Sequence, residues 1–344
     1  MPGLDHELEE EMKQFDETKA GVKGLVDSGV TKLPRMFKHP PEDLPSLNHN
    51  NGISNLQVPV IDLEDVEDSE TRSKIINDLR KAAEEWGFFQ IVNHSVPVGV
   101  MDDVLKGIRR FHEQPQEAKE VWYSRDFTKK VNFVSNAEFK VSLPACWRDT
   151  LSCKVLEDEH NFEAIPEICR AEIKEYMRYL VQLKDKLSKL ISEALGLTSD
   201  YLDNLRCFES RSLACHYYPV CPEPHLTLGG HKHSDLGFIT LLLRASEGLQ
   251  LLHQNVWIDV QPVEGALLAN VSDMLQIITN GKFKSAEHRV VLPPTLEPLT
   301  SIACFIGTDD LQKLYGPLKE LISENNPPIY KEVVFGEYVK RYKL

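Results

Sequence analysis

The chain has 344 residues, of which 42% are hydrophobic, and its formal net charge is −14 at pH 7. This acidic balance disfavours nucleic acid and anionic membrane surfaces as partners, and no stretch approaches the roughly 18 apolar residues of a membrane span. The seven cysteines are an odd number without Cys-x-x-Cys spacing, which argues against a disulfide framework or a zinc ribbon. The acidic N-terminus resembles neither a signal nor a transit peptide, so we expect a cytoplasmic protein that is monomeric.

The first 57 residues predict a helix followed by an arm. Charged residues alternate with spaced apolar ones over residues 1–24, which is typical of one amphipathic helix. Prolines beyond residue 34 break this pattern, so we expect an extended arm that reaches residue 57.

Residues 58–200 predict an αβ region. The run 58–63 favours a short strand, and apolar residues at helical spacing over 75–86 predict an amphipathic helix. The apolar run 88–92 then predicts a buried strand. His94 follows it in a strand-to-helix turn, where we interpret it as a hydrogen-bonding structural residue and not a metal ligand.

The longest helix is predicted near the C-terminal end of this region. Apolar residues recur at spacings of three and four over 166–195, and Gly196 supplies the expected end. We interpret the stripe as core packing and not as a partner-binding zipper. Before this helix, residues 146–153 favour a short strand. The C-terminal segment 321–344 predicts a last helix that begins at Tyr330.

Residues 201–320 contain short apolar runs that favour strands. The runs 236–243, 248–252 and 256–260 are rich in β-branched and apolar residues and are separated by turn residues. Such a succession predicts an antiparallel barrel or sandwich.

Within this region, His233, Asp235 and His288 predict a metal site. Two imidazoles and one carboxylate are the ligand set of non-haem Fe(II) sites that keep open positions. Residues two apart on an extended strand point to the same face, so His233 and Asp235 would converge on one ion. His288 must then come from a second strand that the fold brings alongside the first.

Motifs around these residues resemble the plant 2-oxoglutarate/Fe(II)-dependent dioxygenases, most closely the branch called homologues of 1-aminocyclopropane-1-carboxylate oxidase. The motifs are His216-Tyr-Tyr-Pro219, Lys232-His-Ser-Asp235, Gly248-Leu-Gln250, Lys284-Ser-Ala-Glu-His-Arg289, Ser301-Ile-Ala-Cys-Phe305 and the N-terminal segments 15–24 and 59–63. The resemblance covers nearly the whole chain. It implies an α+β fold with a double-stranded β-helix (jelly-roll) core, flanking helices and an N-terminal αβ region, integrated into one domain.

The resemblance also implies a chemistry. Such enzymes use Fe(II), 2-oxoglutarate and O₂, with ascorbate as reductant, to hydroxylate, demethylate or oxidatively cyclise a mid-sized metabolite of plant specialised metabolism. It gives Tyr218 and Ser301 as hydroxyl donors to 2-oxoglutarate and Phe305 as an aromatic wall near the substrate. Thr150 and Ser152 are expected in the substrate pocket.

His231 needs its own interpretation because it is expected on the ligand face, two residues before His233. It could compete as a metal ligand. Relatives usually carry Ser or Thr there, and we interpret it instead as a residue of the pocket or its rim.

One departure concerns the co-substrate. Relatives hold the far carboxylate of 2-oxoglutarate with an Arg two residues before the strand Ser, where this chain has Leu299, and residues 290–312 contain no Lys or Arg. Leaving a buried charge unpaired costs about 3–5 kcal/mol, which is roughly a 10²- to 10³-fold loss of affinity. We therefore expect weak binding of 2-oxoglutarate unless Arg244 or Arg289 substitutes.

Two alternative functions follow from Leu299. The scaffold could serve a 2-oxoglutarate-independent or non-oxidative enzyme, such as an isomerase or cyclase, or a catalytically silent binding protein. Ser272, in place of a usual Gly, also favours an altered site. The intact metal ligands favour the oxygenase.

Overall fold

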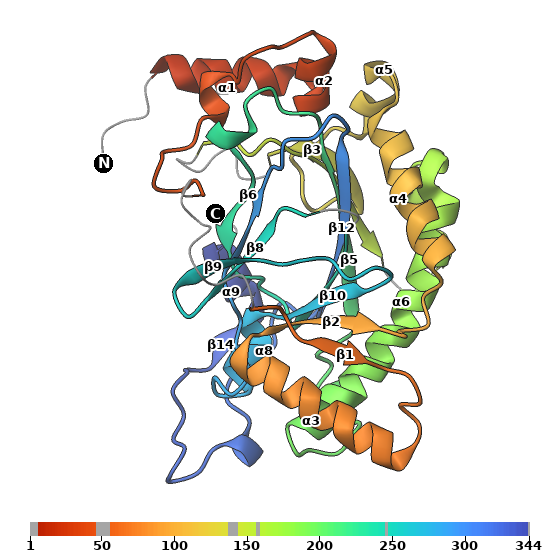
Figure 1. The fold of residues 1–344 in the computed structure, drawn as a ribbon, viewed down its shortest axis with the longest axis vertical. Coiled ribbons are helices and arrows are strands. Elements are labelled where there is room, and N and C mark those ends of the chain that lie inside the picture. Colours follow the sequence, from red (N-terminus) through yellow and green to blue (C-terminus); the bar gives the residue numbers. More distant parts are fainter. Residues whose placement is uncertain (1–5, 46–55, 137–143, 156–158, 245–246, 343–344) are drawn as a thin grey trace.

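The computed structural model describes residues 6–45, 56–136, 144–155, 159–244 and 247–342 (Figure 1). The α-helices are α1 (His6–Thr18), α2 (Gly21–Asp27), α3 (Ser69–Glu85), α4 (Val98–His112), α5 (Gln116–Lys119), α6 (Glu167–Ala194), α7 (Tyr201–Asn204), α8 (Asp273–Ile278) and α9 (Phe335–Tyr342). The strands are β1 (Val60–Asp62), β2 (Phe88–Val92), β3 (Val131–Ser135), β4 (Asp149–Val155), β5 (Ser210–Tyr218), β6 (Leu228–His233), β7 (Ile239–Arg244), β8 (Leu249–His253), β9 (Val256–Asp259), β10 (Leu267–Val271), β11 (His288–Val291), β12 (Leu299–Gly307), β13 (Leu314–Tyr315) and β14 (Val333–Val334).

Two sheets form the core. The larger has the order β1-β2-β10-β7-β12-β5-β4-β3, and the smaller has the order β6-β11-β8-β9. From β5 to β12 the chain passes back and forth between these sheets, which is the jelly-roll arrangement expected from the sequence. One cavity is lined by residues of both sheets, so it lies between them.

Helices α3, α4 and α6 cover the outside of the larger sheet (Figure 1). The apolar stripe of α6 is buried, with residues such as Ile173, Leu180 and Leu187 at 0% exposure, so the stripe packs in the core as predicted. Gly196 follows the helix at φ 82, a backbone conformation that glycine adopts without strain. Among the described residues, no helix is both long and apolar enough to cross a bilayer.

Three predicted boundaries are wrong. The N-terminus forms α1 and α2 in place of one helix, because Lys19 and Gly21 both take positive φ (56 and 69) and break the helical repeat. The strand expected from residue 146 begins at Asp149. The last helix begins at Phe335 and not at Tyr330, because β14 pairs with β13 just before it.

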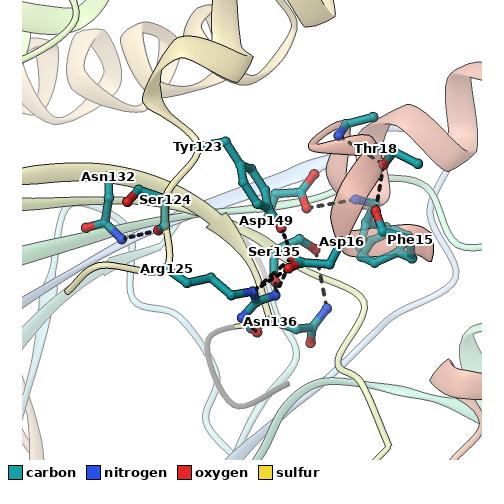
Figure 2. Close-up of polar contacts among 12 residues, drawn as sticks. Phe15, Asp16, Thr18, Tyr123, Ser124, Arg125, Asn132, Ser135, Asn136 and Asp149 are labelled. Atoms are coloured by element: carbon teal, nitrogen blue, oxygen red, sulfur yellow. Dashed lines mark hydrogen bonds and ion pairs between the residues drawn. The ribbon is translucent and has the colours of Figure 1, made fainter. Parts of the chain in front are cut away.

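The N-terminal helices are held by buried polar contacts (Figure 2). The Asp149 carboxylate accepts hydrogen bonds of 2.8 Å from the first backbone N–H groups of α2, on Val22 and Lys23. Burial raises the pKa of Asp149, and these N–H donors oppose that shift. A Cβ on Gly21 would lie 2.5 Å from Asp149, so only glycine allows this approach. The first turn of α2 is thereby fixed to the start of β4.

Candidate metal centre and co-substrate pocket

The structure brings His233, Asp235 and His288 together. His233 ends β6 and is the register partner of His288, the first residue of β11, whereas Asp235 lies just past the strand and not on it. Each has a possible ligand atom within 4.8 Å of the other two. The Nε2 atoms of His233 and His288 lie 3.6 and 3.8 Å from Oδ1 of Asp235.

Backbone carbonyl groups orient both imidazoles. Nδ1 of His233 lies 2.8 Å from the carbonyl oxygen of His231, and Nδ1 of His288 lies 3.2 Å from that of Ala286. A neutral ring that donates from Nδ1 presents an unprotonated Nε2 toward Asp235, and metal-bound histidines commonly have such a second hydrogen bond. Both rings are therefore turned to present ligand lone pairs to one point.

Asp235 is buried, and its second oxygen is fully engaged. Oδ2 accepts hydrogen bonds from the Thr240 hydroxyl (2.6 Å) and the Asn270 amide (2.8 Å), which leaves Oδ1 facing the imidazoles. Burial raises the pKa of Asp235, but the neighbouring imidazoles and these donors outweigh it, so the net shift is downward. The carboxylate is consequently ionised at neutral pH.

The donor set fits a divalent metal. Burial, followed by the nearby His233, lowers the pKa of His288 to about 4, so its imidazole is neutral and able to ligate at physiological pH. Two imidazoles and a carboxylate on one side of a cavity form the facial arrangement of non-haem Fe(II) enzymes, which leaves coordination positions for other ligands.

Alternate residues of β12 line the cavity beside this centre. They are Leu299, Ser301, Ala303 and Phe305, and Thr300 at the start of the strand also contributes to the lining. Tyr218 of β5 is the register partner of Leu299 and also lines the cavity. The hydroxyl groups predicted for 2-oxoglutarate and the aromatic ring predicted for the substrate therefore share one space. Leu299 lies on the same face as Ser301, as expected.

Three other predicted pocket residues do not line this cavity. His231 lies against His39, with ring centroids 5.0 Å apart. Thr150 contacts a lining residue from behind, since its Oγ1 lies 3.0 Å from Nδ1 of His216. Ser152 pairs with Ala214, further along β4. Strand alternation gives the face of a residue but not how far along the strand the cavity extends, so the sequence alone did not fix where these residues lie relative to this cavity.

The two candidate substitute cations differ in direction. Arg289 faces away from the cavity: its Nε donates to Gln250, its Nη1 donates to the Asp43 carbonyl, and its guanidinium stacks on Trp257 at 4.2 Å. Arg244 lines the cavity. The structure therefore leaves Arg244 as the candidate of this pair.

Arg244 is placed next to the co-substrate residues. It is the register partner of Ser301 across β7 and β12, which puts the two Cβ atoms about 5 Å apart and leaves Leu299 as a diagonal neighbour within reach of a long side chain. Its Nη2 donates to the Val260 carbonyl at 2.5 Å. Burial lowers the pKa of Arg244 to about 10, while Glu247, an exposed residue that also lines the cavity, raises it.

Sequence reasoning missed other residues of the site. Arg148 lines the cavity, and a Cβ on Gly230 would lie 3.4 Å from its Nη1. Arg148 stands two residues before Thr150, so the same alternation extended by one step would have found it. Asn270 gave no signal, because only the tertiary fold brings β10 to Asp235.

Comparisons with known proteins agree with this geometry. A family model described as the 2OG-Fe(II) oxygenase superfamily matches residues 209–308, and one described as the N-terminal region of non-haem dioxygenases in morphine synthesis matches residues 58–169. The chain is 46% identical over 339 residues to 1-aminocyclopropane-1-carboxylate oxidase homolog 11 of Arabidopsis thaliana, covering 96% of this chain and 92% of the relative.

Two further proteins show the range of these relatives. The chain is 45% identical to deacetoxyvindoline 4-hydroxylase of Catharanthus roseus, covering 96% of this chain and 84% of that enzyme. Its fold is similar to the crystal structure of JOX2 in complex with 2OG, Fe and JA, with a TM-score of 0.81, 30% identity and coverage of 94% and 93% of the two chains.

Proposed function

The chain belongs to the 2OG-Fe(II) oxygenase superfamily, and we propose that it hydroxylates a mid-sized organic metabolite at an Fe(II) held by His233, Asp235 and His288. The superfamily comprises oxidoreductases that use Fe(II), 2-oxoglutarate and O₂. When bound, the iron would supply oxidation of a C–H bond coupled to decarboxylation of 2-oxoglutarate. The observation that carries the proposal is the convergence of two Nε2 atoms and Oδ1 of Asp235 inside a cavity.

The protein residues then have separate tasks. His233, Asp235 and His288 occupy one side of the metal, and their backbone and side-chain hydrogen bonds hold the ligand atoms in place. Phe88 packs edge-on against His288, with ring centroids 5.3 Å apart, and keeps this side apolar. Phe305, on β12 of the larger sheet, supplies an apolar wall where a substrate carbon could approach the metal.

The far carboxylate of 2-oxoglutarate would be bound by a cation on a different strand from that in relatives. We propose that Arg244 binds the far carboxylate of 2-oxoglutarate from β7, with the hydroxyl groups of Tyr218 and Ser301 beside it. A guanidinium pairs with a carboxylate through short charge-assisted hydrogen bonds. The register of Arg244 with Ser301 supports this role, because it places the cation one strand away from Leu299.

Hydroxylation is the reaction class that the relatives support best. Deacetoxyvindoline 4-hydroxylase is named for such a reaction and is 45% identical to this chain. Demethylation and oxidative cyclisation begin with the same C–H oxidation, so the metal side of the site would serve them equally. The substrate is a small molecule, and its choice depends on residues at the cavity wall such as Phe305 and Arg148.

The test is an assay of purified protein with Fe(II), ascorbate, 2-oxoglutarate and fractionated plant metabolites. We expect succinate release that rises with one fraction and requires O₂, together with a product 16 mass units heavier, about the mass of one oxygen atom gained in this class of reaction. Absence of both, with folded and metal-loaded protein, contradicts the proposal.

A second candidate function rests on the apolar position of Leu299. A non-oxidative isomerase or cyclase would use the metal as a Lewis acid and would need no 2-oxoglutarate. Product formation in anaerobic buffer without 2-oxoglutarate would support this candidate and exclude the oxygenase as the main activity. A protein that binds a metabolite without changing it would give neither product.

A further inference from the structure

Three potential metal ligands meet outside the cavity of the iron site. His39 follows the short helix η1 (Arg35–Phe37), Cys146 precedes β4, and His231 lies in β6. Each offers a donor atom within 4.8 Å of those of the other two. The ring centroids of His39 and His231 are 5.0 Å apart. None of the three lines the cavity that contains His233.

The backbone around this cluster, which we call the Cys-His cluster, is fixed by hydrogen bonds. The N–H of His39 donates to the Leu226 carbonyl (3.0 Å), just before β6. The N–H of Ala145, the neighbour of Cys146, donates to the Met36 carbonyl (2.7 Å). The arm, the approach to β4 and the start of β6 are therefore joined before any ion binds.

His39 has a buried ring nitrogen without a hydrogen-bond partner. Its Nε2 lies 3.2 Å from the Ala145 carbonyl oxygen, so a neutral ring carries its proton there and leaves Nδ1 bare. The residue is 6% exposed, and its Nδ1 has no hydrogen-bond partner among the described residues. Buried polar atoms are nearly always hydrogen-bonded, so this Nδ1 is available to a metal ion or a water molecule.

The chemistry of His39 suits metal binding. Burial, followed by the proximity of His231, lowers the pKa of His39 to about 4, so the imidazole is neutral at physiological pH. A metal-bound histidine typically donates its other N–H to a carbonyl group, as His39 does to Ala145.

We propose that His39, Cys146 and His231 bind one Zn²⁺ ion. A thiolate and two imidazoles are ligands that zinc prefers, and a tetrahedral site leaves one position for water. Zinc–ligand bonds of about 2.0 Å to nitrogen and 2.3 Å to sulfur place ligand atoms roughly 3.3–3.6 Å apart. The donor atoms of the cluster lie within 4.8 Å of one another, so the cluster would contract by no more than about 1.5 Å. As the ion binds, Cys146 loses its thiol proton to solvent, and the two imidazoles and the thiolate replace water molecules of the hydrated ion.

The ion would act as a clip between three segments that are distant in the sequence. It would tie the N-terminal arm and the approach to β4 onto β6. The carbonyl oxygen of His231 is also the hydrogen-bond acceptor for Nδ1 of His233. The clip would therefore steady the strand that carries the first proposed iron ligand, although it does not depend on the proposed oxygenase reaction.

Cobalt(II) is the probe, because a thiolate bound to cobalt gives a near-ultraviolet charge-transfer band that the iron site, which lacks sulfur, does not produce. Full-length protein is stripped with a chelator under reducing conditions and titrated with Co²⁺ and, separately, with Zn²⁺. We expect a sulfur band that corresponds to one thiolate-bound Co²⁺ per chain, saturates by two equivalents because the iron site also takes up Co²⁺, and is displaced by Zn²⁺. Zinc should also raise the melting temperature by mass action.

Variants separate this site from others. Asp235→Asn, which alters the iron site, and Cys221→Ser, a cysteine outside the cluster, should keep the band. Cys146→Ser should abolish it. His231→Ser keeps the thiol and should weaken Co²⁺ binding by more than the roughly 10- to 100-fold that loss of a supporting hydrogen bond costs. A folded wild-type protein without the band, or a band that persists in Cys146→Ser or is unchanged in His231→Ser, overturns the proposal.

Discussion

The metal end and the co-substrate end of one cavity differ in how far their residues can be replaced by others. At the metal end, each ligand of the proposed iron has its own supporting partner, such as the Thr240 hydroxyl on Asp235. At the co-substrate end, Leu299 lies on the same strand as Ser301, and the cation that we propose, Arg244, lies on the neighbouring strand. The comparison teaches that metal chemistry constrains residue identity strictly, whereas a carboxylate needs only a positive charge within reach.

The largest expected effect is at the metal end. We expect His288→Ala and Asp235→Asn to abolish metal-dependent turnover, because each removes one of three converging ligands. The free energy of unfolding should change by no more than about 1–2 kcal/mol, as for residues that hold little of the core. Succinate release and thermal denaturation measure the two quantities. Full activity in both variants would contradict the assignment of these residues as metal ligands.

The next effect concerns Arg244. Arg244→Met should weaken 2-oxoglutarate binding roughly 10²- to 10³-fold, because a buried carboxylate loses its counter-charge at a cost of about 3–5 kcal/mol. Leu299→Arg should restore most of this loss in the Arg244→Met protein, since it returns a cation to the adjacent strand, and should add little in the natural protein. Calorimetric titration of 2-oxoglutarate with metal present measures all three.

Arg289→Met serves as the matched control for Arg244. Its guanidinium is engaged with Gln250 and Trp257 away from the cavity, so affinity for 2-oxoglutarate should stay unchanged while stability falls. If Arg244→Met binds as tightly as the natural protein, the far carboxylate is held elsewhere. Weak binding in the natural protein that Leu299→Arg alone corrects would show that Arg244 does not substitute.

A smaller effect is expected from the hydroxyl groups. Tyr218→Phe and Ser301→Ala should each raise the KM for 2-oxoglutarate about 3- to 10-fold, because a typical hydrogen bond contributes about 0.5–1.5 kcal/mol. Steady-state kinetics at saturating metal measures the change, and kcat should move less than KM. A loss of 2-oxoglutarate affinity as large as that of Arg244→Met would mean that a hydroxyl group, and not Arg244, contributes most to binding 2-oxoglutarate.

The sequence allowed the metal ligands to be predicted. For the co-substrate end it showed only that the usual Arg is replaced by Leu299. His233, Asp235 and His288 were identifiable because ligand chemistry permits few residue types. The direction of Arg244 and Arg289 was not, because it depends on strand register and on partners such as Trp257 that the fold brings together. His231 shows the same limit: its place on a strand was readable, but its contact with His39 depends on where the N-terminal arm packs.

The strands and long helices were predictable for a related reason. Patterns of apolar residues gave α6 and β2 nearly to the residue, since a buried face requires them. The break between α1 and α2 was not, because it follows from the approach of Gly21 to Asp149 across the fold. The local pattern of apolar residues thus predicts helices and strands, whereas contacts between distant segments determine where they end.

The smallest expected effect tests what Arg244 does before 2-oxoglutarate binds. Glu247 lines the same cavity and raises the pKa of Arg244, so its carboxylate competes with the co-substrate for one guanidinium. Because Glu247 is exposed, solvent screens the pair, and such contacts contribute about 0.2–1 kcal/mol. Glu247→Gln should therefore strengthen 2-oxoglutarate binding about 2- to 5-fold at low ionic strength, an advantage that shrinks as salt is added. The same substitution in the Arg244→Met protein should change nothing, because the shared cation is gone. An equal gain in both backgrounds would mean that Glu247 repels the co-substrate directly, and the affinity of the co-substrate end would then depend on overall charge and not on the Arg244 contact.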